Sequence, residues 1–244
     1  MAKAARERTR AARVKKTRPL RVLVACEESQ AVCVAFRAAG HVAFSCDLRP
    51  CSGGHPEWHF QVDVFEVIEK HGPFDLLVAF PPCTHLASSG AMYWAAKRAD
   101  GRQQSALAFC QALYWANVPR VAIENPVGAL SSLWMTPTQI FQPHEHGDAY
   151  TKRTALWLRN LPQLRASKRV APKWRWGSNS TRSGPARDGT RKPSALPNMK
   201  GAANSALKRS KTFPGVARAM AAQWGAGGGL GTQTRLDQLF CLRS

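Results

Sequence analysis

The 244-residue sequence contains no run of apolar residues that approaches the ~18–20 needed for a membrane-spanning helix. Its charged N-terminus has no apolar stretch behind it, so the sequence does not predict a secretory signal. The seven cysteines are scattered and odd in number, which does not suit a disulfide framework. These absences predict a protein of a reducing, cytoplasmic compartment with no membrane partner. Apolar residues still make up 44% of the chain, which excludes a wholly disordered protein.

Acidic residues are scarce at both ends of the chain. Residues 1–21 carry nine Lys and Arg against one acid, and residues 151–244 carry 19 against two. Residues 22–150 are mildly acidic, with seven basic and 12 acidic side chains. This division predicts that the basic flanks hold a polyanion while a different ligand binds the central body. Nucleic acid is the first candidate, because neither flank has the long amphipathic face that would favour an anionic membrane surface.

Short valine-rich runs alternate with helical segments through the central body. The runs lie at 20–26, 41–47, 74–80, 120–125 and 154–158. Helices are expected at 29–39, with Gly40 as the C-terminal stop, and at 103–117. Continuous apolar strands separated by helices are typical of a parallel sheet covered on both faces. The sequence therefore predicts an α/β fold with a doubly wound, mostly parallel sheet and basic irregular flanks, with the site at the carboxyl ends of the strands.

Composition divides the chain into five parts. We expect a basic disordered arm at 1–19, a central domain at 20–164, a basic Trp-containing region at 165–211, a helix at 212–225 that returns to the central domain, and a flexible linker and tail at 226–244. The first part lacks aromatic residues and an apolar period. It is therefore read either as an arm that binds nucleic acid or as a solvated tail that only aids solubility.

Two motifs at strand ends carry chemistry. In FPPCTHLASSG (80–90), Cys83 follows two prolines, which stiffen the loop because proline fixes φ and removes backbone donors. A thiol held in this way is a nucleophile if a base or a positive field lowers its pKa, and a buried structural cysteine is the alternative. In AIENP (122–126), Glu124 ends an apolar run, and a carboxylic acid in a cleft of low dielectric can protonate a ring nitrogen. A helix-capping turn is the alternative for this acid.

The Pro82-Cys83 and Glu124-Asn125 dipeptides, in this order and at this separation, resemble the two signature motifs of the DNA cytosine-5 methyltransferases. In that family the cysteine is the nucleophile and the glutamate is the acid that engages N3 of cytosine. The resemblance implies a Rossmann-like, S-adenosylmethionine-dependent methyltransferase that modifies C5 of cytosine in DNA through a covalent cysteine adduct. It also implies a compact, divergent enzyme of a phage or mobile element, working in the cytoplasm of a bacterial or phage-infected cell.

Further residues are assigned by the same resemblance, which covers roughly residues 20–158 and 212–225. Arg153 resembles the first arginine of the family's Arg-x-Arg motif and joins Cys83 and Glu124 as a catalytic residue. The cofactor implied is S-adenosylmethionine. Its expected contacts are Asp47 at the ribose, Asp63 at the adenine amino group, and Glu28, Ser29 and Pro81 elsewhere. The expected substrate contacts are Pro82, Asn125, Trp174 and Trp176, where the two tryptophans either stack on an extruded base or pack their region onto the body.

The sequence departs from the family at four places, one of which is Ala87, where the family usually has a serine four residues after the cysteine. The first loop reads CEESQAV (26–32) and lacks the family's glycines, so Glu28 or Ser29 would contact the amino or carboxylate end of the cofactor instead. The second arginine of the Arg-x-Arg motif is Ala155. A large target-recognition domain is missing. Two alternatives therefore stay open: a related enzyme acting on a nucleotide, RNA or a modified pyrimidine, and a DNA-binding protein with a relict, non-catalytic body.

Two other clusters bear on cofactors and partners. Cys46, Cys51, His55 and His59 are types that bind zinc, but their spacing is not that of a standard finger, and we expect no metal and a loop over the cofactor instead. The tail TQTRLDQLF (232–240) is similar to the short peptides that bind replication sliding clamps. One helical turn there would bring three apolar side chains together for a hydrophobic pocket. The residues that fit this pattern are Gln233, Leu236, Leu239 and Phe240.

Overall fold

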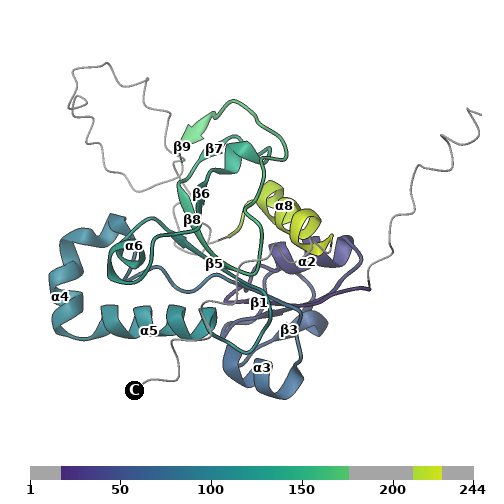
Figure 1. Cartoon of the computed structure of the whole chain (residues 1–244), viewed down its shortest axis with the longest axis horizontal. Coiled ribbons are helices and arrows are strands. Elements are labelled where there is room, and N and C mark those ends of the chain that lie inside the picture. The colour runs from purple at the N-terminus through teal and green to yellow at the C-terminus, as the bar shows by residue number, and fades with distance from the viewer. Residues whose placement is uncertain (1–17, 176–210, 227–244) are drawn as a thin grey trace, which may run out of the picture.

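A computed structural model of the chain describes residues 18–175 and 211–226. Its centre is a seven-stranded sheet with the order β3-β2-β1-β4-β5-β8-β6 (Figure 1). The strands are β1 (Arg21–Ala25), β2 (Val42–Cys46), β3 (His59–Phe60), β4 (Leu76–Ala79), β5 (Val121–Pro126), β6 (Gln139–Phe141) and β8 (Thr154–Arg159). Within the described residues, no helix combines the length and the apolar character that crossing a membrane requires.

The strands β1 to β5 are all parallel to one another. The strand β8 runs antiparallel to its two neighbours, β5 and β6. The prediction of an α/β fold with a mostly parallel sheet is confirmed. The five apolar runs all became strands, but the fifth, β8, lies antiparallel. The sequence analysis missed β3 and β6, because strands of two and three residues are too short to show a pattern.

Both faces of the sheet are covered, which explains why its strands read as continuous apolar runs. In β1, Val22 and Val24 face one core cluster and Leu23 and Ala25 face the other. The first cluster is covered by α2 (Ala31–Ala38) and α8 (Pro214–Gly225). The second is covered by α3 (Val64–His71), α5 (Arg102–Tyr114) and α6 (Ala129–Leu133), with α4 (Trp94–Ala99) beside them.

The first helix begins later than the sequence pattern suggested. We expected it to start at Ser29, but α2 starts at Ala31, because Gln30 adopts a left-handed conformation with φ 58°. The carboxylate of Glu27 accepts hydrogen bonds from the backbone N–H groups of Val32 (2.6 Å) and Cys33 (3.2 Å) and so caps the helix. Gly40, with φ +88°, follows its last turn.

The C-terminal helix lies far from the other helices in sequence but beside α2 in space (Figure 1). Met220 and Trp224 of α8 belong to the same core cluster as the side chains of α2. The indole N–H of Trp224 also donates to the carbonyl of Pro162 at 3.0 Å. This packing brings residues 211 and 212 next to the edge of the sheet where the strands end.

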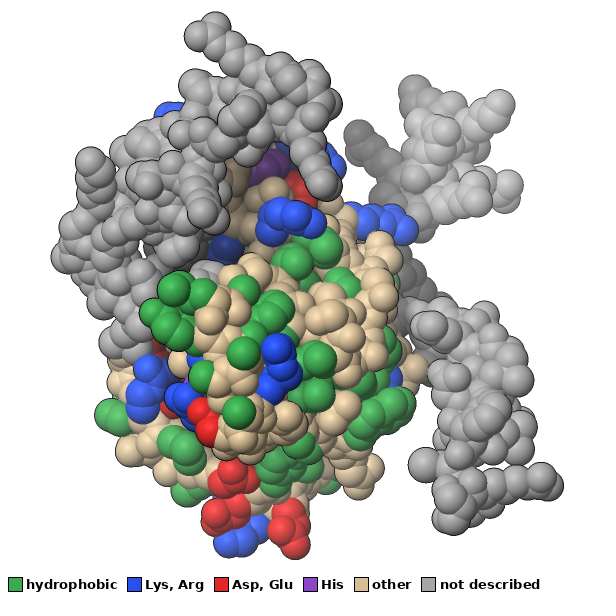
Figure 2. Space-filling view, turned by 90° about the vertical axis from the view of Figure 1, so that its left-hand side faces the viewer, with side chains coloured by type: hydrophobic (Ala, Val, Ile, Leu, Met, Phe, Trp, Pro, Cys, Tyr) green, Lys and Arg blue, Asp and Glu red, His purple; other side chains and the backbone are tan. Residues whose placement is uncertain are grey.

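A second, two-stranded parallel sheet joins β7 (Tyr150–Thr151) to β9 (Trp174–Arg175). It begins the basic region that the sequence analysis placed at 165–211, of which residues 176–210 lie outside the described part. On the face shown in Figure 2, Lys and Arg side chains are interspersed with hydrophobic ones, while acidic side chains gather at the lower end of the molecule.

Candidate active site at the carboxyl ends of the strands

A cavity of about 1090 Å³ opens where the strands β1, β2, β4 and β5 end, slightly above the roughly 300–1,000 Å³ typical of pockets for small molecules. The strand order reverses between β1 and β4, and ligands of open α/β sheets bind at such a switch point. The expected site residues that line this cavity are Glu28, Ser29, Asp47, Asp63, Pro81, Pro82, Cys83, Glu124 and Arg153. The structure therefore brings the two motifs and the acids of the first strands into one space.

The segment after β4 holds Cys83 in a tight turn. Pro81 is buried and Pro82 is exposed at the rim. The backbone carbonyl of Cys83 accepts hydrogen bonds from the N–H groups of Leu86 (3.0 Å) and Ala87 (2.9 Å). Cys83 itself is half-buried and faces the cavity. The thiol is thus accessible to a ligand but held on a rigid turn.

The loop after β5 fastens this turn from the other side. Ala129 donates its N–H to the carbonyl of Leu86 at 2.7 Å, and Gly128 forms an isolated antiparallel β-bridge with Ala87. A Cβ on Gly128 would lie 2.1 Å from the carbonyl oxygen of Leu86, so only glycine allows the two chains to pass this closely. The loops that follow Cys83 and Glu124 therefore move as one unit.

Asn125 connects the two motifs directly. Its side-chain amide donates a hydrogen bond of 2.9 Å to the carbonyl oxygen of Pro81. The residue is fully buried and is not among those that line the cavity. The sequence analysis expected Asn125 to contact the substrate, but its observed contact is with the segment that carries Cys83.

Glu124 is paired with a residue that the sequence analysis did not select. The ammonium of Lys152 lies 3.9 Å from its carboxylate, and the side chains are only 14% and 19% exposed for Glu124 and Lys152 respectively. Burial raises the pKa of Glu124, and the positive charge of Lys152 works against that rise. Arg153, the neighbouring residue that was expected to be catalytic, is exposed at the mouth of the cavity.

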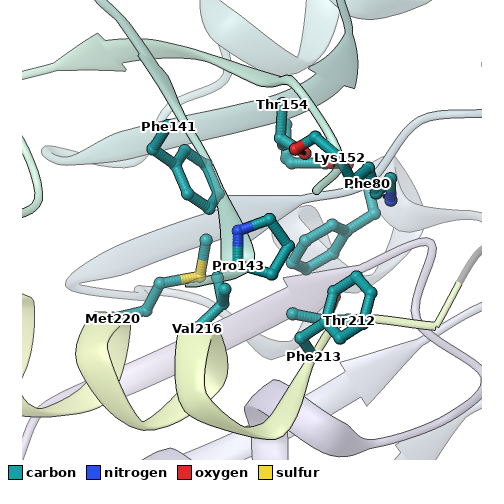
Figure 3. Close-up of a pocket in the computed structure, with 10 residues that line it drawn as sticks. Phe80, Phe141, Pro143, Lys152, Thr154, Thr212, Phe213, Val216 and Met220 are labelled. Carbon is teal, nitrogen blue, oxygen red and sulfur yellow. Dashed lines mark hydrogen bonds and ion pairs between the residues drawn. The ribbon is translucent and has the colours of Figure 1, made fainter. Parts of the chain in front are cut away.

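Lys152 and Arg153 lie just before β8 and differ in their surroundings. Lys152 lines a small space together with Glu124 and Thr154, whereas Arg153 lines only the large cavity. Figure 3 shows Lys152 and Thr154 beside Phe80 around a small space between the sheet and α8. That space holds about 10 Å³, enough for roughly one water molecule and too small for a base or a cofactor.

At the other end of the cavity lies Glu28, one of whose carboxylate oxygens has no hydrogen-bond partner among the described residues. This oxygen is Oε1, and Glu28 is 5% exposed. Its neighbour Glu27 is fully occupied by the cap of α2. The pKa of Glu27 is raised to about 8. Burial is the main cause and the charge of Glu28 adds to it, while the hydrogen bonds from the two N–H groups of α2 act in the opposite direction. Sequence alone did not separate these two adjacent acids.

The two aspartates already have partners within the chain. Asp47 accepts hydrogen bonds from the backbone and the guanidinium of Arg49 at 3.0 and 3.2 Å. Asp63 caps α3 by accepting the N–H of Phe65 at 2.8 Å. Each still faces the cavity. A carboxylate keeps several acceptor positions after one such bond, so both can serve a ligand as well.

The residues at this end fit S-adenosylmethionine. Its amino group is a cation, which suits the buried carboxylate of Glu28, whose Oε1 atom has no hydrogen-bond partner among the described residues. Its ribose hydroxyls and adenine amino group are donors, which suit the acceptor oxygens of Asp47 and Asp63. Ser29 is half-buried in the same wall of the cavity.

Of the remaining expected residues, only the backbone of Trp174 is described. Trp174 pairs with Tyr150 through the backbone of β9, and Trp176 lies outside the described residues. The residues assigned to clamp binding also lie outside them: Gln233, Leu236, Leu239 and Phe240.

The candidate zinc residues have other partners. The thiol of Cys46 donates to the carbonyl of Val62 at 3.2 Å. The ring nitrogens of His59 bond to the hydroxyl of Ser45 (2.8 Å) and the carbonyl of Arg49 (2.9 Å). In residues 18–175 and 211–226, no three His, Cys, Asp or Glu side chains are arranged to hold a metal ion.

Comparisons with known proteins concern the fold only. No protein-family model matches the sequence, and no curated protein matches it. Among solved structures, Schizosaccharomyces pombe Dnmt2 methyltransferase aligns over 60% of this chain and 51% of its own, with 14% identity and a TM-score of 0.41. A triple mutant of DNMT2 from Spodoptera frugiperda aligns over 62% and 54%, with 14% identity and a TM-score of 0.36.

A protein described as a DNA modification methyltransferase, encoded within a prophage of E. coli, aligns over 57% of this chain and 46% of its own. Its identity is 14% and its TM-score is 0.36. The chain therefore spans about half the length of the solved structures that it matches. At this identity the likeness concerns the arrangement of strands and helices and not single site residues.

Proposed function

We propose that the chain methylates C5 of cytosine in DNA, with S-adenosylmethionine as methyl donor and a covalent adduct with Cys83. One observation supports this most: Cys83 and Glu124 line the same cavity, and the bond from Asn125 to Pro81 links the segments that carry them. A thiol and a protonatable carboxylate across one space are what activation of a pyrimidine ring requires. The setting proposed is the cytoplasm of a bacterial or phage-infected cell.

The chemistry follows from the weak reactivity of C5 in the intact ring. The thiolate of Cys83 adds to C6 and forms a carbon–sulfur bond, while Glu124 holds a proton at N3. The electron pair of the C5–C6 double bond then becomes available at C5, as in an enamine. When bound, S-adenosylmethionine supplies the methyl group. Water takes the C5 proton, the Cys83 sulfur leaves C6 as a thiolate, and Glu124 takes back the N3 proton, which restores the ring.

The raised pKa of Glu124 suits this role, because a buried carboxyl keeps its proton at a higher pH than an exposed one. Lys152 sets an upper limit to that rise. Arg153, exposed at the mouth, is proposed to orient the base near its O2 atom. Pro82 at the rim is the proposed neighbour of the incoming base.

The cofactor is proposed to lie along the ends of β1 and β2. Glu28 holds its ammonium and Asp47 its ribose, while Asp63 accepts from the adenine amino group. Ser29 and Pro81 complete the contacts. Cys83, at the end of β4, lines the same cavity as these residues.

DNA is the proposed substrate because of charge. A cytosine must leave the duplex to reach Cys83, which costs a few kcal/mol. Contacts between basic side chains and phosphates can offset that cost. The formal net charge of +20 is the balance between two strongly basic flanks and a mildly acidic body, and we propose that residues 1–19 and 165–211, with Trp174 and Trp176, supply the DNA contacts.

The test is transfer of a radiolabelled methyl group from S-adenosylmethionine to duplex DNA. Cys83→Ser should reduce transfer on the order of 10³-fold or more, because the nucleophile is lost. The matched control is Cys51→Ser, since Cys51 is half-buried but does not line the cavity. It should retain activity.

Parallel reactions with single-stranded RNA and with free deoxycytidine nucleotide separate the alternatives. Label in RNA or in the nucleotide, but not in DNA, would show that DNA is not the substrate and that the labelled molecule is. Full activity of Cys83→Ser would show that Cys83 is not the nucleophile. Absence of both label and cofactor binding would indicate a relict body.

A further inference from the structure

A lysine is buried behind the turn that carries Cys83. Lys97 lies on α4 and is 8% exposed. Its ammonium donates a hydrogen bond of 2.7 Å to the carbonyl oxygen of Thr84, the residue that follows Cys83. Lysine is rarely buried without a partner of opposite charge, so this position calls for an explanation.

No carboxylate balances this ammonium within the described residues. The ion pairs formed there, at nitrogen-to-oxygen distances of up to 4.0 Å, do not include Lys97. The observed partner is a neutral carbonyl. A buried charge with only neutral partners is costly, and an anion nearby would relieve that cost.

The ammonium lies directly behind the wall of the cavity. Gly90 lines the same cavity as Cys83 and Thr84. A Cβ on Gly90 would be 3.2 Å from the ammonium nitrogen of Lys97 and 3.9 Å from the carbonyl oxygen of Thr84. The ammonium thus lies next to Gly90, a residue of the wall of the space that Cys83 faces.

A second buried side chain holds the next carbonyl of the same turn. Gln103 on α5 is 1% exposed, and its amide donates to the carbonyl of His85 at 3.1 Å. Adjacent helices α4 and α5 thus bind the two residues after Cys83, one through a neutral amide and one through a cation. The neutral amide would suffice for position alone, so the charge on Lys97 suggests an additional electrostatic role.

We infer that Lys97 is a positioning residue for Cys83: its ammonium holds the turn and stabilises the thiolate form of Cys83. The inference rests on the proposed function, which gives Cys83 its role as nucleophile. A thiolate is the reactive form of cysteine, and a nearby cation favours it. The anion that relieves the burial of Lys97 is then the thiolate itself.

Other charged and titratable groups line the same cavity or lie on the same turn, and their charges also act on Cys83. They are His85 on its own segment, Glu124 on β5, Lys152 and Arg153 before β8, and Glu28 after β1. Glu124 and Glu28 oppose the thiolate when they are ionised, and Lys152 is paired with Glu124. Lys97 differs from the other cations because it is bonded to the backbone of the Cys83 turn.

The test measures the reactivity of Cys83 and does not depend on methyl transfer. The full chain is alkylated with iodoacetamide between pH 6 and 10, and the rate at Cys83 is followed by mass spectrometry of its peptide. Lys97→Met removes the charge and keeps the stem, Lys97→Arg keeps the charge, and Lys70→Met on the exposed face of α3 is the control. Cys51 in the same digest is the internal reference.

We expect Lys97→Met to move the pH midpoint for Cys83 up by about one unit and to slow its alkylation at pH 7 roughly tenfold. Lys97→Arg should restore most of the rate, and Lys70→Met and Cys51 should be unchanged. The same midpoint in Lys97→Met and in the unaltered chain would overturn the inference.

If Lys97→Met does not fold, as judged by circular dichroism, the unaltered chain decides. Its Cys83 midpoint must then lie below that of a synthetic peptide of residues 80–90, and an equal or higher midpoint would overturn the inference. The labelling assay for methyl transfer is run on the same preparations. A shift without methyl transfer would contradict the proposed function and leave the role of Lys97 intact.

Discussion

The side-chain amide of Asn125 donates a hydrogen bond of 2.9 Å to the carbonyl oxygen of Pro81. This bond joins the ends of β5 and β4, and thereby fixes the distance between Glu124 and Cys83, which belong to separate parts of the chain. Both residues of the bond are buried, so water cannot replace it easily. On the proposed function, Asn125 is thus a positioning residue for the segment that carries Cys83.

Loss of this bond should disturb activity more than stability. Asn125→Ala leaves the Pro81 carbonyl unsatisfied and should lower the free energy of unfolding by about 1–3 kcal/mol. Because the reacting groups would be displaced, methyl transfer should fall on the order of 10²-fold. Gln163→Ala, which removes an exposed amide bonded to the carbonyl of Thr138 at 2.8 Å, should change neither strongly. Equal losses of transfer in both variants would refute the positioning role.

Lys152 should control the pH range of the enzyme. Its charge lowers the pKa of Glu124, which burial raises. In Lys152→Met the carboxyl should keep its proton to higher pH, so the alkaline limb of the methyl-transfer profile should move to higher pH. Arg153→Met should lower the rate and leave this limb in place. If instead Arg153→Met moved the alkaline limb and Lys152→Met left it in place, Arg153 would be the partner of Glu124 in solution.

Glu28 should anchor the cofactor. Its Oε1 atom is buried in the cavity without a partner among the described residues. Glu28→Gln removes the charge that would meet the cofactor ammonium, so the dissociation constant for S-adenosylmethionine should rise roughly tenfold or more. Titration calorimetry measures this without turnover. Glu69→Gln, on the exposed side of α3, should bind like the unaltered chain, and a Glu28→Gln variant that does so too would exclude the contact.

Glu27 should make stability fall as the pH rises. Its pKa is raised to about 8 in the folded chain from an ordinary value of 4.5. Between these pH values the folded chain binds more protons than the unfolded chain, so the free energy of unfolding decreases with pH through this window and levels off above it. Glu27→Gln should flatten that slope in urea unfolding followed by circular dichroism. Glu57→Gln, with an exposed carboxylate, should keep it, and an unchanged slope in Glu27→Gln would refute the assignment.

Much of the fold was predictable from the sequence because its signal is strong. The valine-rich runs became the central strands, and parallel strands end at one edge of a sheet. Cys83 and Glu124 therefore had to lie near each other once both were placed at strand ends. The antiparallel direction of β8 was not predictable, since an apolar run has no intrinsic direction.

The sequence did not indicate which of two adjacent residues makes a given contact. Whether Lys152 or Arg153 meets Glu124 depends on the register of β8 against β5, which only the structure gives. Whether Glu27 or Glu28 caps α2 depends on the start of that helix, which lies two residues later than expected. The burial of Lys97 runs against the usual exposure of lysine and leaves no signature in composition.

The central claim is that Cys83 forms a covalent bond to C6 of cytosine, and trapping that bond tests it most directly. The full chain is incubated with S-adenosylmethionine and duplex DNA in which every cytosine is 5-fluorocytosine. A fluorine at C5 cannot leave as a proton does, so the adduct should persist through denaturation. We expect one protein–DNA adduct whose linked peptide contains Cys83, and none with Cys83→Ser. Methylation of ordinary DNA with no adduct at Cys83 would contradict the account.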